Sequence, residues 1–433
     1  MKRTWPVLLS TIIILIAMLF YSYGYLNRIL PTVMVPGLTQ KFHINITDLG
    51  ILSAYFYWAY TLMQLPTGIL FDRYGVRNMM LTASLAVTLG SFMFALGPSL
   101  WVAEMGRFVI GFGASFAFIG VLKLAVIWMP FRYFAIISGL TSSVGLVGAM
   151  LSVIGAAKLV QLYGTTKTSL VIAAIGIIIT LLMFIFIKDR EKTVDNEPEH
   201  MNSFKQVLQA LVQMLKNPHI WINGVIGFCL YLPINCFAAL WGVPYLKKAF
   251  MMSTSTASWA ITTLIIGFAI GGPLIAWLSN SIERRKAPLI ICCFCSGLAF
   301  LVLIYGSWTQ VSAVFVILFI LGFFSSAQAL VFPIAHEYTV STASGTATSL
   351  TNMFMTFGGT LFLPLVGFLM DIHNTGITAG LAHTKLANSA LTLHTSDYQF
   401  AFTLLPMLTI LAGIAGFFLK ETYGKPLHLE KAL

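Results

Sequence analysis

Long apolar runs alternate with short polar connections along the whole chain. A transmembrane helix needs about 20 mainly apolar residues, and twelve runs meet this requirement. The pattern therefore predicts an all-α membrane protein with twelve transmembrane helices. The runs cover residues roughly 8–34, 47–70, 79–98, 101–127, 134–157, 167–187, 219–241, 257–279, 287–306, 311–335, 345–370 and 399–419.

A charge-rich stretch at residues 188–218 divides the runs into two groups of six. We expect an N-terminal six-helix bundle at 1–187, a cytoplasmic linker at 188–218 and a C-terminal six-helix bundle at 219–433. The linker is interpreted as solvated, with a short amphipathic helix near 203–216. A long polar loop at 371–398 falls on the outer face, and its sequence suggests no function.

The two halves match when the sequence is shifted by 208 residues without gaps. The matches occur at equivalent places, after the first and the second run of each half. The shift places Val35-Pro36-Gly37-Leu38 on Val243-Pro244-Tyr245-Leu246, Asp72 on Asn280, and Arg77 on Arg285. We interpret this as a decayed duplication, so the two bundles should be pseudo-symmetric. Parallel six-helix repeats with a site at their interface are typical of secondary transporters.

The composition supports this interpretation. Apolar residues make up 58% of the chain and charged residues 9%, whereas soluble domains carry about 25% charged residues. This excludes a soluble enzyme, a disordered chain and a disulfide scaffold. The net charge of +11 lies mainly in short loops, so it indicates topology rather than nucleic-acid binding. With both termini in the cytoplasm, the cytoplasmic segments hold sixteen Lys and Arg residues and the opposite face six, as the positive-inside rule requires.

These features predict a multi-pass protein of a bacterial inner membrane, and we expect a monomer embedded in lipid with a small-molecule substrate. The sequence contains no phosphate-binding loop of the form G-x-x-x-x-G-K-[ST], which excludes an ATP-driven pump. It also shows no metal-ligand cluster and no nucleophile constellation. We therefore expect neither an enzyme, nor a cofactor, nor a metal site.

The loop after the second run reads G-I-L-F-D-R-Y-G-V-R over residues 68–77. It resembles the signature G-x-x-x-D-R-x-G-R-[RK] of the major facilitator superfamily, and departs from it at Val76. The resemblance implies that the loop gates the conformational change, and Gly68 is expected to permit close helix packing; the alternative is a plain positive-inside turn. The expected gating residues are Gly68, Asp72, Arg73, Gly75, Arg77 and, in the second copy, Arg285. That copy has Asn280 for Asp72 and Glu283 for Gly75, so its gate should be weaker or differently paired.

The fourth run contains Arg107-Phe-Val-Ile-Gly111-Phe-Gly113, which resembles the R-x-x-x-G-x-G pattern of the same superfamily. Arg107 lies about two turns inside the membrane, where a charge needs a partner. Two possibilities remain open. Arg107 pairs with Glu104 at i,i+3, or with backbone and polar groups of the first span.

A narrower resemblance, to the anion:cation symporter branch, rests on two segments. Tyr25-Leu-Asn27-Arg28 is similar to the branch's Y-L-D-R, and Lys123-Leu-Ala-Val-Ile-Trp128-Met-Pro to its R-x-x-x-x-W-F-P. The resemblance implies that Arg28 anchors an anionic group of the substrate, and the planar guanidinium suits a carboxylate. Lys123 would be a second cation. The alternative for Arg28 is that it snorkels to the outer interface.

Two departures concern coupling. The branch has an acid where this chain has Asn27, and another where it has Ala114. Since a buried carboxylate is the usual proton carrier, coupling would fall to other residues or be absent, and exchange and facilitated diffusion remain open. The coupling candidates are Glu104, Arg107, His336 and Glu337.

Polar and aromatic residues within the runs complete the candidate substrate site, although each could instead bond another helix. Together with Arg28 and Lys123 they are Tyr25, Tyr57, Gln64, Tyr231, Asn235, Gln328 and Asn352. The predicted function is secondary transport of a small carboxylate-bearing solute, an organic anion or amino acid, by alternating access, with or without proton coupling. The alternatives are efflux of a drug or siderophore-like compound and uncoupled exchange. A sensor without transport would need a longer soluble segment than the 31-residue central loop.

Overall fold

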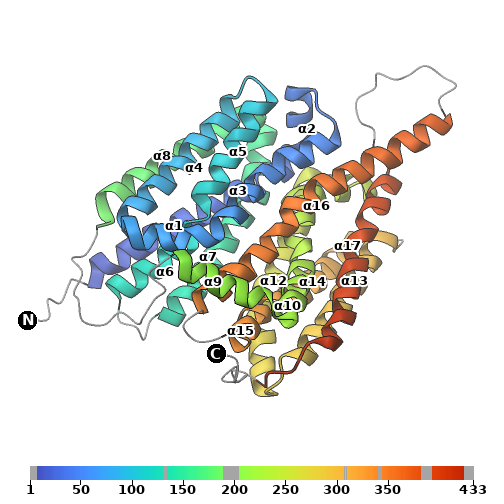
Figure 1. The fold of residues 1–433 in the computed structure, drawn as a ribbon. Helices are drawn as coiled ribbons and strands as arrows, with labels where there is room; N and C mark the ends of the chain where they lie inside the picture. Colours follow the sequence, from blue (N-terminus) through green and yellow to red (C-terminus); the bar gives the residue numbers. More distant parts are fainter. Residues whose placement is uncertain are drawn as a thin grey trace, which may run out of the picture. The chain divides into compact units, whose positions relative to one another are not determined.

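The computed structural model describes residues 7–129, 134–188, 204–306, 308, 310–339, 344–381 and 393–423, and these contain helices and no strand (Figure 1). The first half comprises α1 (Val7–Ile29), α2 (Pro31–Phe42), α3 (Ile46–Tyr74), α4 (Val76–Leu96), α5 (Leu100–Ala114), α6 (Ala117–Trp128), α7 (Phe134–Met150), η2 (Leu151–Ala156) and α8 (Ala157–Phe186). The second comprises α9 (Phe204–Leu215), α10 (Pro218–Leu232), η3 (Pro233–Trp241), α11 (Gly242–Ala249), α12 (Thr254–Ser281), α13 (Lys286–Tyr305), α14 (Val311–Ser325), η4 (Ser326–Leu330), α15 (Val331–Glu337), α16 (Ser344–Leu381), α17 (Thr395–Ala415) and η6 (Gly416–Phe418).

Ten segments of the described chain are long and apolar enough to cross a membrane. One of them, Leu140–Phe186, has 47 residues, which is about 70 Å of helix and twice the thickness of a bilayer core. Gly164 interrupts it with φ 80° and ψ 171°, so this segment supplies two spans. The remaining span is α3, whose 29 residues are long enough to cross. The predicted all-α membrane fold with twelve spans is confirmed.

The chain forms two compact units. The first consists of residues 1–30 and 55–206, and the second of residues 31–54 and 207–433. The helix α3 is therefore shared, because its first nine residues pack with the second unit and the rest with the first. We call the end of each span that the charge pattern assigns to the cytoplasm its inner end, and the opposite end its outer end.

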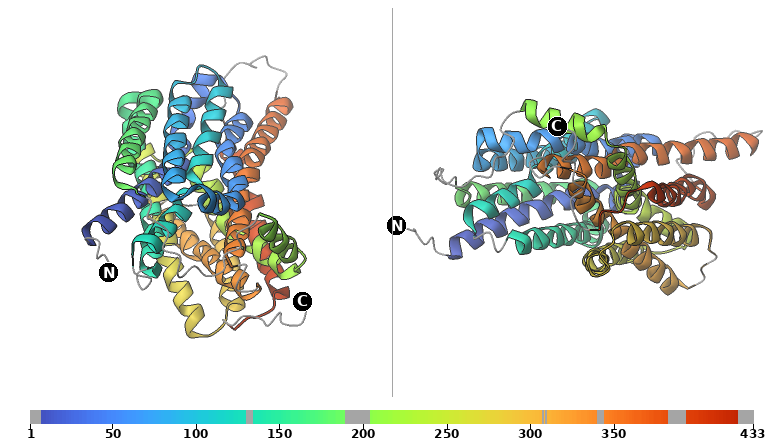
Figure 2. Two further views of the ribbon diagram at one scale, coloured as in Figure 1. Left: turned by 60° about the vertical axis from the view of Figure 1, so that its left-hand side comes forward. Right: turned by 60° about the horizontal axis from the view of Figure 1, so that its bottom comes forward.

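Within the first unit, α4 packs against α5 and α8, and α1 against α7 and α6. Within the second unit, α12 packs against α14, α13 against α17, and α10 against α16. The 38-residue α16 is a single long helix whose last turns extend beyond its neighbour α17 (Figures 1 and 2). The amphipathic helix expected in the linker is α9, where Leu208 and Val212 present an exposed apolar face.

Four spans are interrupted at repeat-related places, which supports the duplication. The first span breaks at Leu30, between α1 and α2, and its mate, the seventh, contains the π-helical η3. The fourth span breaks at Ser115–Phe116, between α5 and α6, and its mate, the tenth, contains the 3-10 segment η4. Irregular backbone within a membrane span is tolerated only where protein or a cavity surrounds it, and in transporters such breaks border the substrate site.

Candidate functional site

Arg28, in the last turn of α1, lies within a cage of tyrosines. Its side chain is buried, with 4% of the residue exposed. The Nε donates to the Tyr57 hydroxyl at 3.0 Å. The guanidinium carbon lies 5.2, 4.9 and 5.9 Å from the ring centres of Tyr25, Tyr57 and Tyr60, within range of cation–π attraction. The sequence identified Tyr25 and Tyr57 but missed Tyr60, although its i,i+3 spacing from Tyr57 was a readable signal.

Arg107 replaces a backbone hydrogen bond that the first span lacks because residue 31 is a proline. In a continuous helix the carbonyl of Asn27 would accept the N–H of residue 31, but proline has none. The Arg107 guanidinium supplies the missing donor, with Nη1 at 2.5 Å from the Asn27 carbonyl and Nη2 at 3.3 Å from that of Arg28. Of the two partners expected for Arg107, the backbone of the first span is therefore the one that these hydrogen bonds identify.

The glycine of the same motif explains how Arg107 reaches the first span. A Cβ at Gly111 would lie 2.0 Å from the Phe56 carbonyl oxygen, so the backbones of α5 and α3 touch there. Arg107, one turn away, lies with its guanidinium carbon 5.1 Å from the Phe56 ring centre. The pattern R-x-x-x-G thus combines a close helix contact with a buried cation one turn further along.

Asn27 is held by neutral partners. Its amide nitrogen donates to the Tyr23 carbonyl at 2.9 Å, and its amide oxygen accepts from the Ser91 hydroxyl at 3.1 Å. The Tyr23 hydroxyl lies 3.3 Å from the Ser91 oxygen and donates to the Ile172 carbonyl at 3.0 Å. Where the branch that the sequence resembles has an acid, the side chain of this residue is therefore an amide bonded to uncharged groups. The sequence missed Tyr23 and Ser91.

Lys123 lies far from Arg28 along the membrane normal. It is on α6, sixteen residues past Arg107, or about 24 Å at 1.5 Å per residue. Arg107 contacts the Arg28 carbonyl, so Lys123 is much nearer the inner end. A small solute held by Arg28 would not reach Lys123 at the same time. The remaining candidate of the first unit, Gln64, is buried and donates to the Tyr60 carbonyl at 3.2 Å.

The candidates of the second unit are dispersed over several helices. Asn235, in η3, is fully buried and donates to the Met355 carbonyl at 2.8 Å, which is a helix-to-helix bond. The ring of Tyr231 lies 5.8 Å from that of Phe268. Asn352 lies on α16, half-buried. The side-chain oxygen of Gln328, in η4, is buried and has no hydrogen-bond partner among the described residues. The sequence missed Asn223, which is buried and donates to the Val331 carbonyl at 2.8 Å.

The expected gating loop connects α3 and α4. Gly75, with φ 82° and ψ 157°, occupies a backbone region that is essentially restricted to glycine. The Nε of Arg77 donates to the Ile187 carbonyl just beyond α8, at 2.8 Å, and Arg73 is exposed. The side chain of Asp72 lies outside the described residues. Gly68 does not mediate close packing as expected, because a Cβ there would meet nothing within 4 Å.

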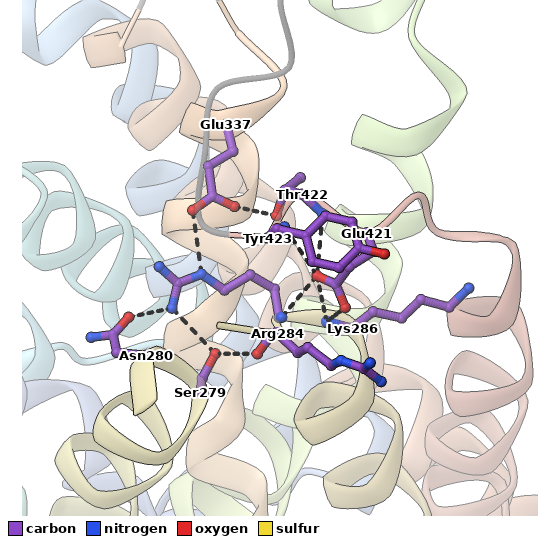
Figure 3. A network of polar contacts seen from close by, with 9 residues as sticks. Ser279, Asn280, Arg284, Lys286, Glu337, Glu421, Thr422 and Tyr423 are labelled. Atoms are coloured by element: carbon purple, nitrogen blue, oxygen red, sulfur yellow. Dashed lines mark hydrogen bonds and ion pairs between the residues drawn. The ribbon is translucent and has the colours of Figure 1, made fainter. Parts of the chain in front are cut away.

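The second copy of this loop is part of a larger network at the inner end of the second unit (Figure 3). Arg285 pairs through Nε with the Glu337 carboxylate at 3.3 Å and through Nη1 with the Asn280 side-chain oxygen at 2.5 Å. Glu337 also accepts the Thr422 hydroxyl. The copy is thus differently paired, as the sequence indicated, because Glu337 of the tenth span replaces the missing acid of the loop.

The segment after the last span completes this network. The Glu421 carboxylate accepts the backbone N–H of Arg285 at 2.8 Å and that of Lys286 at 3.1 Å, so a negative charge caps the start of α13. The Tyr338 hydroxyl donates to the Lys420 carbonyl. Burial, with Glu421 and Glu337 nearby, raises the pKa of Tyr338, which keeps the phenol protonated and able to donate. Neither Glu421 nor Thr422 was identified from the sequence.

The coupling candidates are thus engaged to different degrees. Glu337 is held by Arg285 and Thr422, and Arg107 by the backbone of the first span. His336 shares a hydrogen bond of 2.9 Å with the Thr348 hydroxyl. Glu104 is buried near the outer end of α5. Among the described residues, no group of three or more His, Cys, Asp and Glu side chains could hold a metal ion.

Comparisons with known proteins agree with this architecture. The family described as Major Facilitator Superfamily matches twice, over residues 12–241 and 224–432. The "Probable sulfoacetate transporter SauU" of Cupriavidus necator is 22% identical over 63% of this chain and 65% of its own. The "Membrane sensor protein UhpC" of Escherichia coli is 23% identical over 85% of this chain and 87% of its own. A bacterial homologue of the human lysosomal transporter Spinster has a similar fold, with a TM-score of 0.75, 14% identity and coverage of 95% and 97%.

Proposed function

Since the chain belongs to the major facilitator superfamily, we propose that it carries a small carboxylate-bearing solute, an organic anion or amino acid, by alternating access. Members of this family are secondary transporters of small solutes rather than enzymes. The proposed orientation places both termini in the cytoplasm, since this assigns the larger share of Lys and Arg to that side. The proposed location is a bacterial inner membrane.

The observation that carries the proposal is Arg28 in its tyrosine cage. A buried cation within a span is costly and marks a functional site by default. Tyr57 fixes the Nε, and the rings of Tyr25 and Tyr60 limit the rotation of the guanidinium. A guanidinium with a fixed plane is suited to a carboxylate, which it meets with two parallel hydrogen bonds. The relative named as a sulfoacetate transporter adds support, because sulfoacetate carries a carboxylate.

We propose that Asn27 takes no part in proton coupling. Its partners are neutral, and an amide does not titrate. Glu337 is committed to Arg285 and Thr422. This favours exchange or facilitated diffusion over symport, with Glu104 and His336 as the residues through which coupling would otherwise occur. Uptake into proteoliposomes with and without a pH gradient distinguishes proton symport from exchange and facilitated diffusion. Only symport should accumulate the solute when a pH gradient is applied.

The test of the substrate class is a thermal-shift screen of the purified protein with organic acids, amino acids, sugars, nucleosides and cationic drugs. We expect carboxylates to stabilise the native chain and not the Arg28→Gln variant. Lys123→Gln is the matched control, because it removes an equal charge about 24 Å away and should leave the stabilisation intact. Stabilisation by cationic drugs that persists in Arg28→Gln would contradict the proposal and favour efflux.

The second candidate function is sensing without net transport. The short central loop argued against it, but the relation to a membrane sensor protein that is matched over 87% of its own length favours it. A sensor would use the same binding site as a transporter but would not move the solute across the membrane. A ligand found in the thermal-shift screen, loaded radiolabelled into proteoliposomes, distinguishes the two. Exchange with unlabelled ligand outside supports transport, and binding without exchange supports sensing.

A further inference from the structure

A row of aromatic rings leads from Arg28 toward the inner end of α1. Tyr25 and Tyr21 precede Arg28 at i−3 and i−7, so the three side chains share one face of the helix. The ring centre of Tyr25 lies 5.2 Å from the Arg28 guanidinium carbon, and that of Tyr21 lies 5.1 Å from that of Tyr25. The ring of Phe118, on α6, follows at 5.4 Å from Tyr21. We call Tyr25, Tyr21 and Phe118 the ring row.

The middle of the ring row is fixed by two neighbouring helices. The fourth span breaks between α5 and α6, and Phe118 is the second residue of α6, so the break positions its ring beside α1. A Cβ at Gly145, on α7, would lie 2.5 Å from the edge of the Tyr21 ring, so this ring lies directly against the α7 backbone. Tyr21 is 8% exposed. The rings are therefore held in place before any ligand binds.

The two ends of the ring row keep uncovered surface. Tyr25 and Phe118 are half-buried, whereas Tyr21 between them is buried. Charged side chains within spans face the interior of the bundle or a water-filled cavity. The uncovered surface of Tyr25 lies beside the buried Arg28, so we assign it to that interior, where a solute bound to the guanidinium would meet it.

The ring row has the geometry that an aromatic solute prefers. Aromatic rings favour edge-to-face contacts with centres about 4.5–7 Å apart, and Tyr21 and Tyr25 already form such a pair, with an interplanar angle of 70°. The row extends over the seven residues from Tyr21 to Arg28, which is about 10 Å along the helix. A carboxylate on Arg28 with a ring one or two bonds away would therefore bring that ring against Tyr25 and Tyr21.

We propose that the solute is an aryl-substituted carboxylate, whose carboxylate binds Arg28 and whose ring packs on the ring row. The inference rests on the proposed function and narrows its substrate class. A dicarboxylate fits this site less well, because its second charge would lie against uncharged rings. Arg107 is bonded to the backbone of the first span, and Lys123 is about 24 Å away.

The experiment is isothermal titration of the purified protein with phenylacetate and with cyclohexylacetate. The two acids share the carboxylate and the connecting carbon, and differ in whether the ring is aromatic. We define the ring preference as the affinity for phenylacetate divided by the affinity for cyclohexylacetate. Comparing this ratio between variants cancels the difference in hydrophobicity between the two acids, and leaves the contact between aromatic rings.

Tyr25→Leu and Tyr21→Leu should each lower the ring preference by about 2–13-fold, the factor that corresponds to one aromatic pair beyond its buried area. Tyr25→Phe keeps the ring and should keep the preference. Phe112→Leu is the matched control, because Phe112 is a half-buried aromatic residue of α5 whose ring contacts Phe116 and lies outside the row. Its ring preference should equal that of the native chain.

Two results would overturn the ring row. One is an unchanged ring preference in both leucine variants, and the other is an equal fall in Phe112→Leu, which would mean that any lost ring loosens the unit. Melting temperatures show that the variants compared are folded. Arg28→Gln separates this inference from the proposed function. Binding of both acids that persists in Arg28→Gln, or no binding of either acid to the native chain, contradicts the carboxylate proposal itself. Binding that requires Arg28 without a ring preference that depends on Tyr25 or Tyr21 contradicts only the aryl class.

Discussion

Glu283 adopts a left-handed backbone, with φ 51°, at the position that the 208-residue repeat pairs with Gly75, whose φ is 82°. Both copies of the loop therefore turn through positive φ between equivalent helices, α3 to α4 and α12 to α13. In the second copy a side chain occupies a conformation that costs non-glycine residues roughly 1–2 kcal/mol. The two copies share the positive φ at this position, although the connection is one residue long in the first copy and four residues long in the second.

Glu283→Gly should therefore stabilise the protein, by up to about 1 kcal/mol, because glycine adopts positive φ without steric cost. Gly75→Ala should destabilise it by about 1–3 kcal/mol, because φ 82° with ψ 157° is almost restricted to glycine. Denaturant midpoints in detergent measure both. Equal and small effects of the two substitutions would show that the two turns are not equivalent.

Arg107→Met should destabilise the chain by about 1–3 kcal/mol, the cost of a buried carbonyl without a donor. Pro31→Ala should reduce that loss, because residue 31 then has an N–H for the Asn27 carbonyl. The measurement is a double-mutant cycle of unfolding free energies, with an expected coupling of about 0.5–3 kcal/mol. Additive losses would mean that Arg107 does not compensate for the proline.

Tyr57→Phe removes the acceptor of the Arg28 Nε while keeping the ring beneath the guanidinium. One such bond contributes about 0.5–1.5 kcal/mol, so ligand affinity should fall about 2–13-fold and the melting temperature should change little. Isothermal titration with the ligand from the thermal-shift screen measures this. Tyr163→Phe, at an exposed tyrosine, is the control and should bind as the native chain does.

Glu421→Gln should loosen the inner network. The amide keeps one acceptor oxygen but loses the charge that caps α13, for a loss of about 0.3–1 kcal/mol. Arg285→Ala should cost more, since it leaves the buried Glu337 carboxylate without its cation. Thermal unfolding in detergent compares the two, and the order of the losses is the result that checks the network.

The apolar face of α9 should contact lipid. A spin label on Leu208→Cys, at a side chain that is 47% exposed, should be relaxed by oxygen, which concentrates in the bilayer. A label on Gln213→Cys, on the opposite face of the helix, should be relaxed by a water-soluble nickel complex. Equal access of the nickel complex to both labels would show that both faces of α9 are in water, and that α9 does not contact lipid.

The sequence by itself determined the twelve spans, the positions of the two motif loops and the duplication. Each of these depends on the length of an apolar run, on a short motif or on the spacing between motifs, and all three are properties of neighbouring positions. Arg28 and Arg107 could be identified for a related reason, because a charge inside an apolar run is conspicuous without any knowledge of its partners.

Only the tertiary structure decided which groups meet. Thr47, whose backbone N–H donates to the Asp371 carboxylate, lies 324 residues from it along the chain, and Arg285 and Glu421 are 136 apart. Neither pair leaves a trace in local pattern. Gly68 is the opposite case. Its motif predicted a close helix contact, but a Cβ at this position would meet nothing within 4 Å. Helical periodicity tells which residues share a face, but the neighbour of that face depends on how whole helices pack. For this reason the spans follow from the sequence, whereas the partners of Arg107 and Asp371 follow only from the fold.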